Sequence, residues 1–174
     1  LALAEDRPRS VTVQPGDGPR HLALSPCGRL AAVVNELSNT VTLFRRENGT
    51  LRALDTCSTL PEGWEGTTHT AEILFHPTAP VLYATNRGYD TVAVFTYDRE
   101  TGQLEAPRWL PSGGEKPQAL AINARGTLLL VANMPGGVVT LFPVDPSTGQ
   151  PGEPVATQPV AMPGSLLLVP DPHG

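Results

Sequence analysis

The sequence is poor in the features that mark several common classes of protein. Aromatic residues make up 5% of its 174 residues, and the two cysteines lack the spacing of a metal site or a disulfide framework. Its apolar runs fall short of the ~20 residues of a membrane-spanning helix. Its basic residues are scattered along a chain of net charge −5, whereas nucleic-acid binding requires a clustered basic face. We therefore expect no membrane and no nucleic acid among its partners, and we expect Cys27 and Cys57 to be ordinary thiols of a cytoplasmic protein.

Proline and glycine, in contrast, are abundant, with 19 and 17 residues. Proline interrupts long helices because it lacks a backbone N–H and its ring clashes with the preceding turn. An apolar fraction of 40% is high enough for a folded core. The composition therefore predicts an all-β protein of many short strands joined by turns, with residues 1–174 in one domain.

One pattern of residues recurs three times along the chain, at intervals of about 50 residues. Each unit predicts four strands: a short apolar strand, a strand that is apolar throughout, a strand that alternates with period two, and an irregular outer strand. The first three strands are expected at residues 21–25, 30–34 and 40–44, and at the equivalent places in the next two units. Three sets of identical residues mark the register, the glycines lying at predicted hairpin turns: Asn35, Asn86 and Asn133; Phe44, Phe95 and Phe142; Gly49, Gly102 and Gly149.

Four-stranded repeats of this length are typical of the blades of a β-propeller. The alternative, a β-sandwich, would not place asparagine at one repeat position three times. We predict a β-propeller fragment of about three complete four-stranded blades, at approximately residues 17–65, 66–114 and 115–161, with partial blades at residues 1–16 and 162–174. Within the partial blades, residues 11–14 are expected to form an outer strand and residues 163–168 a first strand.

Three blades cannot close a ring, because propellers use about 4–8 blades. We therefore expect the chain to be roughly the second half of a larger propeller. The alternative is a half-propeller that self-associates through its two uncovered blade faces, which carry apolar residues.

The first strands of a propeller line its central channel, so equivalent residues of the repeat form rings around that channel. The repeated asparagines are the same in every unit, and we expect each to tie a loop to backbone groups. Other rings carry unlike and oppositely charged residues: Arg20, His21, Glu36, Glu72 and Arg87. Two arginines can hold a carboxylate or phosphate, and a nearby Glu or His can activate water as a general base. These residues indicate either a site for an anionic ester or lactone, or a set of solvated charges at loop ends.

The remaining histidines have other expected roles. His69 follows the longest segment between two blades, residues 61–68, which is a candidate lid over the site. His76 precedes a proline at a turn where the first unit has Ser25, and it is expected to be structural. No two histidines have ligand spacing on one element, so no metal site is predicted, and His173 lies in a C-terminal tail.

Four motifs together resemble those of the lactonase family of seven-bladed propellers. They are residues 18–21 (Gly-Pro-Arg-His), residues 34–36 (Val-Asn-Glu), the loop at 60–64 that leads into 71–73, and residues 85–88 (Thr-Asn-Arg-Gly). The family includes the bacterial propeller-type 6-phosphogluconolactonases and is related to the fungal carboxy-muconate cyclases. The resemblance covers about residues 15–169 and corresponds to the C-terminal half of the family fold.

The resemblance implies a hydrolase that opens a small anionic sugar lactone, with 6-phosphogluconolactone as the leading substrate and no metal or organic cofactor. It implies catalytic roles for Arg20, Glu36 and Arg87, and it makes His21 and Glu72 candidate substrate-binding residues. His69 is a further candidate because of its place beside the loop that could cover the site. A further histidine of the family lies in the half of the ring that this chain lacks. Two alternatives remain open. One is a lactonising cyclase that uses the same site in the opposite direction, and the other is a non-catalytic binding scaffold, in which Arg20, Glu36 and Arg87 would not converge.

Overall fold

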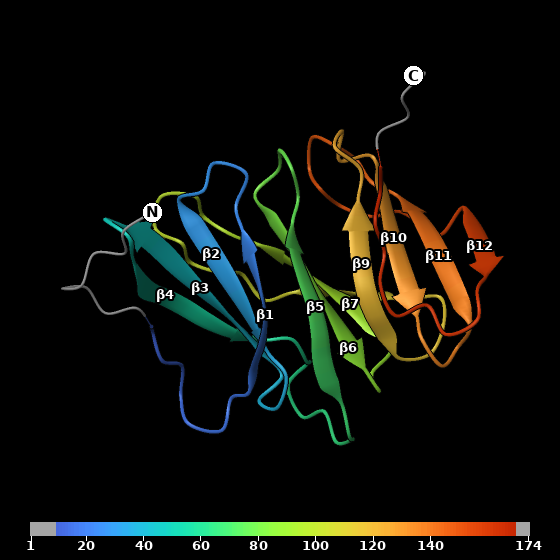
Figure 1. The fold of residues 1–174 in the computed structure, drawn as a ribbon, viewed down its shortest axis with the longest axis horizontal. Coiled ribbons are helices and arrows are strands. Elements are labelled where there is room, and N and C mark those ends of the chain that lie inside the picture. Colours follow the sequence, from blue (N-terminus) through green and yellow to red (C-terminus); the bar gives the residue numbers. More distant parts are fainter. Residues whose placement is uncertain (1–9, 170–174) are drawn as a thin grey trace.

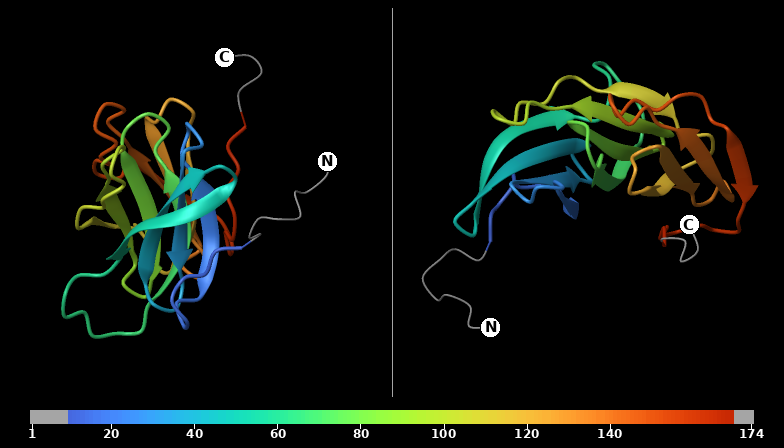
Figure 2. Two further views of the ribbon diagram at one scale, coloured as in Figure 1. Left: turned by 90° about the vertical axis from the view of Figure 1, so that its left-hand side faces the viewer. Right: turned by 90° about the horizontal axis from the view of Figure 1, so that it is seen from above.

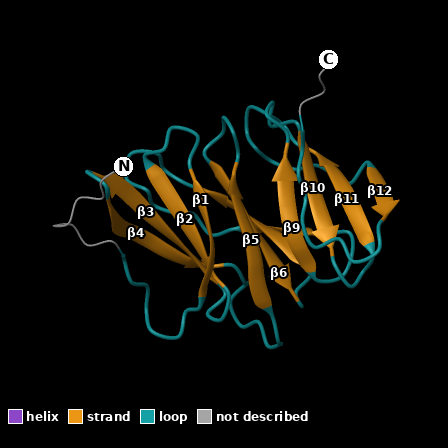
Figure 3. Ribbon diagram, viewed as in Figure 1, coloured by secondary structure: helices purple, strands orange, loops and turns teal. Residues whose placement is uncertain are grey.

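Twelve strands in three antiparallel sheets make up the computed structural model, which describes residues 10–169 (Figure 1). The first sheet contains β1 (Pro19–Leu24), β2 (Leu30–Asn35), β3 (Thr40–Glu47) and β4 (Thr50–Ser58). The second contains β5 (His69–Phe75), β6 (Val81–Arg87), β7 (Thr91–Thr96) and β8 (Arg108–Pro111). The third contains β9 (Pro117–Ile122), β10 (Leu128–Asn133), β11 (Val138–Pro143) and β12 (Ala156–Pro159). Every sheet is a meander whose strands pair in chain order (Figure 3).

The three sheets stand side by side as neighbouring blades and form an open arc (Figure 2). Seen from above, β1, β5 and β9 line the concave side of the arc, and β4, β8 and β12 lie toward its convex side. The inner strands of adjacent sheets contact each other, β1 with β5 and β5 with β9. The chain is therefore a fragment of a β-propeller, as the repeat predicted, and its concave side is a wall of the central channel. The described residues contain no helix long and apolar enough to cross a membrane.

Two apolar cores join the middle sheet to its neighbours. Leu82 and Ala84 of β6 face the first sheet and belong to one core. Val81 and Tyr83 of the same strand face the third sheet and belong to the other. Adjacent residues of β6 thus enter different cores, which confirms the prediction that an apolar second strand is buried on both faces.

The hairpin turns before the outer strands depend on the predicted glycines. Gly102 and Gly149 have φ values of +75° and +70°, a conformation that glycine adopts without steric cost. Both also lie against the preceding sheet. A Cβ on Gly102 would lie 2.1 Å from Cδ1 of Leu54, and a Cβ on Gly149 would lie 2.8 Å from Cγ2 of Val81. Each glycine therefore serves both the turn and the packing between blades.

Each inner strand has a β-bulge near its start, and it therefore begins before the predicted residue. In β1 the register shifts between Pro19 and His21, so that Arg20 has no partner in β2. The same shift in β9 leaves Gln118 without a partner in β10, and the register of β5 shifts after Thr70. A bulge turns its side chain out of the regular alternation of the strand. In all three blades the irregularity falls at the ring that the repeat had identified as channel-lining.

The strands predicted at the two ends of the arc are absent. Residues 11–14 and 163–168 form no strand, because each would need a neighbouring strand of its own blade to pair with, and the described chain supplies none. Instead, Val13 packs on the outer face of the first sheet and Leu166 on the outer face of the third. The outer strand is short in the second and third sheets, but β4 has nine residues. Residues 1–9 and 170–174, with the rest of the predicted partial blades and His173, lie outside the described residues.

Candidate active site

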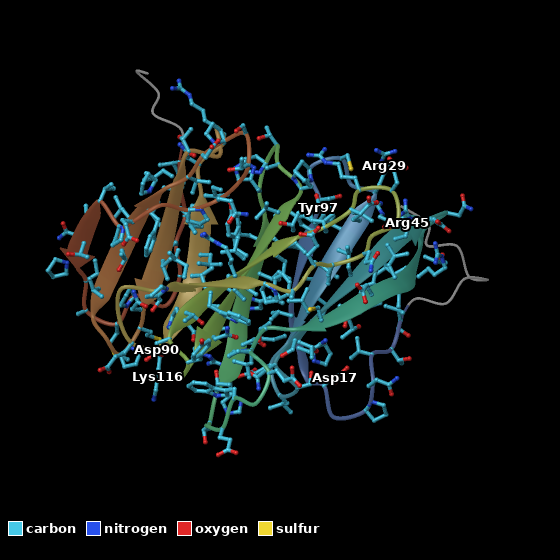
Figure 4. The ribbon with its side chains drawn as sticks, turned by 180° about the vertical axis from the view of Figure 1, so that it is seen from behind. Asp17, Arg29, Arg45, Asp90, Tyr97 and Lys116 are labelled. Carbon is cyan, nitrogen blue, oxygen red and sulfur yellow. The ribbon has the colours of Figure 1, made fainter. Side chains whose placement is uncertain are left out.

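The charged residues of the inner rings meet at one end of the arc. This is the end that carries Asp17, Asp90 and Lys116, opposite Arg29 and Tyr97 (Figure 4). We call it the Asp17 end. The turns after β2 and β6 and the first residues of β1, β5 and β9 all lie there, so residues far apart in the sequence become neighbours.

Glu36, in the turn after β2, lies between two arginines of different blades. Its Oε2 is 3.6 Å from Nε of Arg20, and its Oε1 accepts a hydrogen bond from Nη2 of Arg87. The hydrogen bond from Arg87 is the main cause that lowers the pKa of Glu36 below its ordinary value. Glu36 is therefore ionised near neutral pH, and its first effect is to hold the two guanidinium groups together.

Arg87, at the end of β6, is fixed by further acceptors. Its Nε donates to the backbone oxygen of His69 and its Nη2 to that of Thr70, both at 3.3 Å. Its Nη1 donates to the side-chain oxygen of Gln118 at 3.3 Å. Gln118 was not among the predicted site residues, although the repeat places it in the same ring as Arg20.

A second pair stands beside the arginines. Nδ1 of His21 lies 2.8 Å from Oε1 of Glu72. Because a carboxylate oxygen only accepts, Nδ1 carries a proton and donates it to Glu72. Nη1 of Arg20 lies 3.2–3.3 Å from both ring nitrogens of His21 and donates to the backbone oxygen of Ala71 at 2.6 Å. The structure thus brings together Arg20, Glu36 and Arg87, and it places the pair of His21 and Glu72 against them.

His69 takes part in the site mainly through its backbone carbonyl and less through its side chain. Its carbonyl receives Arg87, whereas its Nδ1 is buried without a hydrogen-bond partner among the described residues. The side chain lies close enough to Glu36 to lower the pKa of that carboxyl by charge, as a smaller cause than the arginines.

The loop at residues 61–68 is pinned to the rim of the second sheet. The ring of Trp64 packs on Tyr89, with centroids 4.3 Å apart, and Tyr89 contacts Trp109 of the outer strand. A Cβ on Gly88 would lie 2.3 Å from the backbone oxygen of Thr67. The loop projects on the side of the outer strands (left view of Figure 2). The aromatic contacts of the predicted lid are therefore made with the blade rim and not with the arginines.

The repeated asparagines are buried. Nδ2 of Asn86 donates to the backbone oxygen of Thr59, and Nδ2 of Asn133 donates to that of Ser112, which confirms that these two tie inter-blade segments. Asn35 differs, because its Nδ2 donates to the hydroxyls of its own sheet at Thr40 and Thr42.

His76 is structural, as predicted. It is fully buried, its Nδ1 accepts from the backbone N–H of Ala79 at 2.8 Å, and its Nε2 lies 3.0 Å from the backbone oxygen of Gly126. It therefore joins a turn of the second blade to a turn of the third.

Cys27 is not an ordinary thiol. It lines a pocket together with Arg29, which lies at the end opposite Asp17 (Figure 4). A hydrogen bond with Ser25, followed by contacts with Arg29, lowers its pKa to about 7. The pKa of Cys57, in contrast, is raised by burial. This difference could not be predicted from the sequence, because the partners of Cys27 are set by the shape of one turn.

Comparisons with known proteins agree with this architecture. The family model "Lactonase, 7-bladed beta-propeller" matches residues 2–168. The periplasmic gluconolactonase of Pseudomonas aeruginosa is 34% identical with a TM-score of 0.81, over 87% of this chain and 42% of that one. A Bacteroides fragilis protein assigned as a 6-phosphogluconolactonase is 30% identical with a TM-score of 0.83, over 92% of this chain and 44% of that one. An uncharacterised Staphylococcus saprophyticus protein is 34% identical over 141 residues, which are 80% of this chain and 41% of that protein.

The chain thus spans about two fifths of the length of the relatives that it matches. The family match, however, extends over nearly all of its residues, and both solved structures share its arrangement of blades. The chain belongs to the family of seven-bladed β-propeller lactonases.

Proposed function

We propose that the protein hydrolyses sugar lactones, with 6-phosphogluconolactone as the leading substrate. The observation that carries the proposal is the convergence of Arg20, Glu36 and Arg87 from two blades, with the pair of His21 and Glu72 beside them. The name of the P. aeruginosa relative, a gluconolactonase, supports the same class of reaction.

In the proposed mechanism His21 is the general base. Glu72 holds the proton on Nδ1. Nη1 of Arg20 lies 3.2 Å from Nε2, and in the proposed step water replaces it there, gives its proton to Nε2 and attacks the lactone carbonyl through its oxygen. The electron pair of the carbonyl moves to its oxygen, and donors of Arg20 stabilise that oxyanion. The ring C–O bond then breaks, and the imidazolium returns its proton to the leaving ring oxygen.

Glu36 is less suited to the role of base. Its pKa is lowered by the hydrogen bond from Arg87, so it binds a proton weakly near neutral pH. We assign it the task of fixing the two arginines. This division of roles needs no metal or organic cofactor.

The choice between a phosphorylated and an unphosphorylated lactone depends on charge. Nη2 of Arg20 makes none of the hydrogen bonds found among residues 10–169, and its two N–H donors can bind a phosphate of the substrate. Gluconolactone is the second candidate, because the P. aeruginosa relative bears the name of that activity.

The site geometry bears differently on the two other hypotheses, the lactonising cyclase and the binding scaffold. A lactonising cyclase would use the same arginines and the same base in the opposite direction. A non-catalytic scaffold predicted that Arg20, Glu36 and Arg87 would lie apart, and their convergence counts against it.

The test is hydrolysis of freshly generated 6-phosphogluconolactone, with gluconolactone in parallel, by the protein expressed from its full natural coding sequence. We expect a rate above spontaneous hydrolysis that falls at least about tenfold in Arg87→Ala. Arg108→Ala, an exposed arginine of the same blade, is the matched control. No rate on either lactone would refute the proposal and would make ring closure of a muconate the next assay.

A further inference from the structure

Arg87 is held by acceptors from three blades. Glu36 belongs to the first blade, the carbonyls of His69 and Thr70 belong to the second, and Gln118 belongs to the third. Gln118 reaches the guanidinium because it is the bulged residue of β9, the position that Arg20 occupies in β1. The bulge turns both side chains toward the same end of the channel.

The two arginines differ in the donors that they leave free. An arginine has five N–H donors, and the four hydrogen bonds of Arg87 occupy all but one of them. Nη2 of Arg20, in contrast, makes none of the hydrogen bonds found among residues 10–169, while its Nε and Nη1 face Glu36 and Ala71. Arg20 therefore presents the donor edge to a ligand, and Arg87 serves to fix Glu36 and, through it, Arg20.

Gln118 also sets the charge of this cluster. Its oxygen accepts from Arg87 as a carboxylate oxygen would, but the amide carries no charge. Arg20 and Arg87 balance the two carboxylates of Glu36 and Glu72, so that these four groups sum to about zero. A glutamate at position 118 would offer the same acceptor and make the sum negative.

We infer that Gln118 positions Arg87 and, by its neutrality, keeps the cluster selective for an anionic lactone. The inference rests on the proposed function and goes beyond it, because it assigns geometry and charge selectivity to one side chain of the third blade. It predicts different results for the two roles of Gln118. Loss of the acceptor should slow the reaction of every lactone, whereas an added negative charge should weaken binding of the phosphorylated lactone alone.

The experiment compares Gln118→Leu and Gln118→Glu on 6-phosphogluconolactone and on gluconolactone, in the protein expressed from its full natural coding sequence. We expect Gln118→Leu to lower kcat by about tenfold on both lactones, because the hydrogen bond that holds Nη1 is lost. We expect Gln118→Glu to keep kcat within about threefold of wild type and to raise KM about fivefold to tenfold for the phosphorylated lactone alone. Gln103→Leu, at an exposed glutamine of a hairpin, is the control, and Gln118→Ala replaces the leucine variant if circular dichroism shows that leucine prevents folding.

The outcomes separate this inference from the proposed function. An inactive wild type refutes the proposed function, and the position of the Arg87 guanidinium in crystals of Gln118→Leu then decides the positioning role. An active wild type with unchanged Gln118→Leu overturns the inference. Equal losses of activity in Gln118→Leu and Gln118→Glu on both lactones also overturn the inference. The oxygen acceptor that glutamate keeps would then have no effect on activity, as expected if the side chain served only the fold.

Discussion

Replacing Glu36 by glutamine removes the charge that joins the two arginines but keeps the shape of the side chain. A hydrogen bond to a charged partner is worth about 1.5–3 kcal/mol. The side chain of Glu36 is one-third exposed (33%), so solvent screening places the expected loss in the lower part of that range. At about 1.4 kcal/mol for each factor of ten, we expect Glu36→Gln to lower kcat/KM by about tenfold to thirtyfold.

The pH dependence gives the same variant a second readout. The folded-state pKa of Glu36 lies below its ordinary value, so its contribution to stability is present above that ordinary value and is lost as the pH falls through the lowered one. Wild type should therefore lose part of its resistance to urea in acid, and Glu36→Gln should show a smaller acid loss. The assays are kcat/KM at neutral pH and the urea midpoint between pH 7 and pH 3.

The control is Glu62→Gln, an exposed residue of the loop at 61–68. A Glu36→Gln variant with kcat/KM within threefold of wild type and an unchanged acid limb would refute the assigned role of Glu36 as the bridge between the arginines.

Three other properties can be measured. Alkylation of Cys27 by iodoacetamide should reach half of its maximal rate near pH 7, because the thiolate is the reactive form and its pKa is lowered to about 7. Cys57 should react at higher pH. Equal pH profiles of the two cysteines in peptide mapping would contradict this prediction. The 174-residue chain should self-associate in sedimentation experiments, because one face of the first sheet is uncovered. Leu22→Lys on that face should weaken the association more than Leu37→Lys in a turn. A wild-type monomer with full β-type circular dichroism would contradict the predicted self-association. Phe95→Ala, in the core between the first two blades, should lower the free energy of unfolding by about 3–5 kcal/mol, and a loss below 1 kcal/mol in urea titration would show that this core is not tightly packed.

The blades could be predicted from the sequence, because each of them is formed by consecutive strands whose apolar patterns recur along the chain. The apolar second strands and the repeated asparagines fix which residues pair and which ring each residue joins, and the structure confirms the β-propeller fragment. The five charged ring residues could likewise be named from register alone. Their assignment to roles could not, because the repeat does not say which side chains of adjacent blades touch.

Gln118 shows this limit most clearly. Its ring position was known, but a neutral side chain gave no chemical signal until Arg87 was seen to donate to it. The packing of Trp64 on Tyr89 and the pKa of Cys27 depend in the same way on the course of single loops. The cytoplasmic location and the roles of the site residues stay predictions, and the P. aeruginosa relative is periplasmic.

The β-bulges at the start of the inner strands have a consequence for how such a ring diversifies. The bulged residue has no partner in the neighbouring strand, so its identity is nearly independent of the sheet that carries it. One blade places arginine there and another glutamine, while the buried strands beside them keep the same apolar pattern. The first and third blades thus each offer a position at which new chemistry can be tried at little cost in folding, whereas the second blade places the buried Ala71 there.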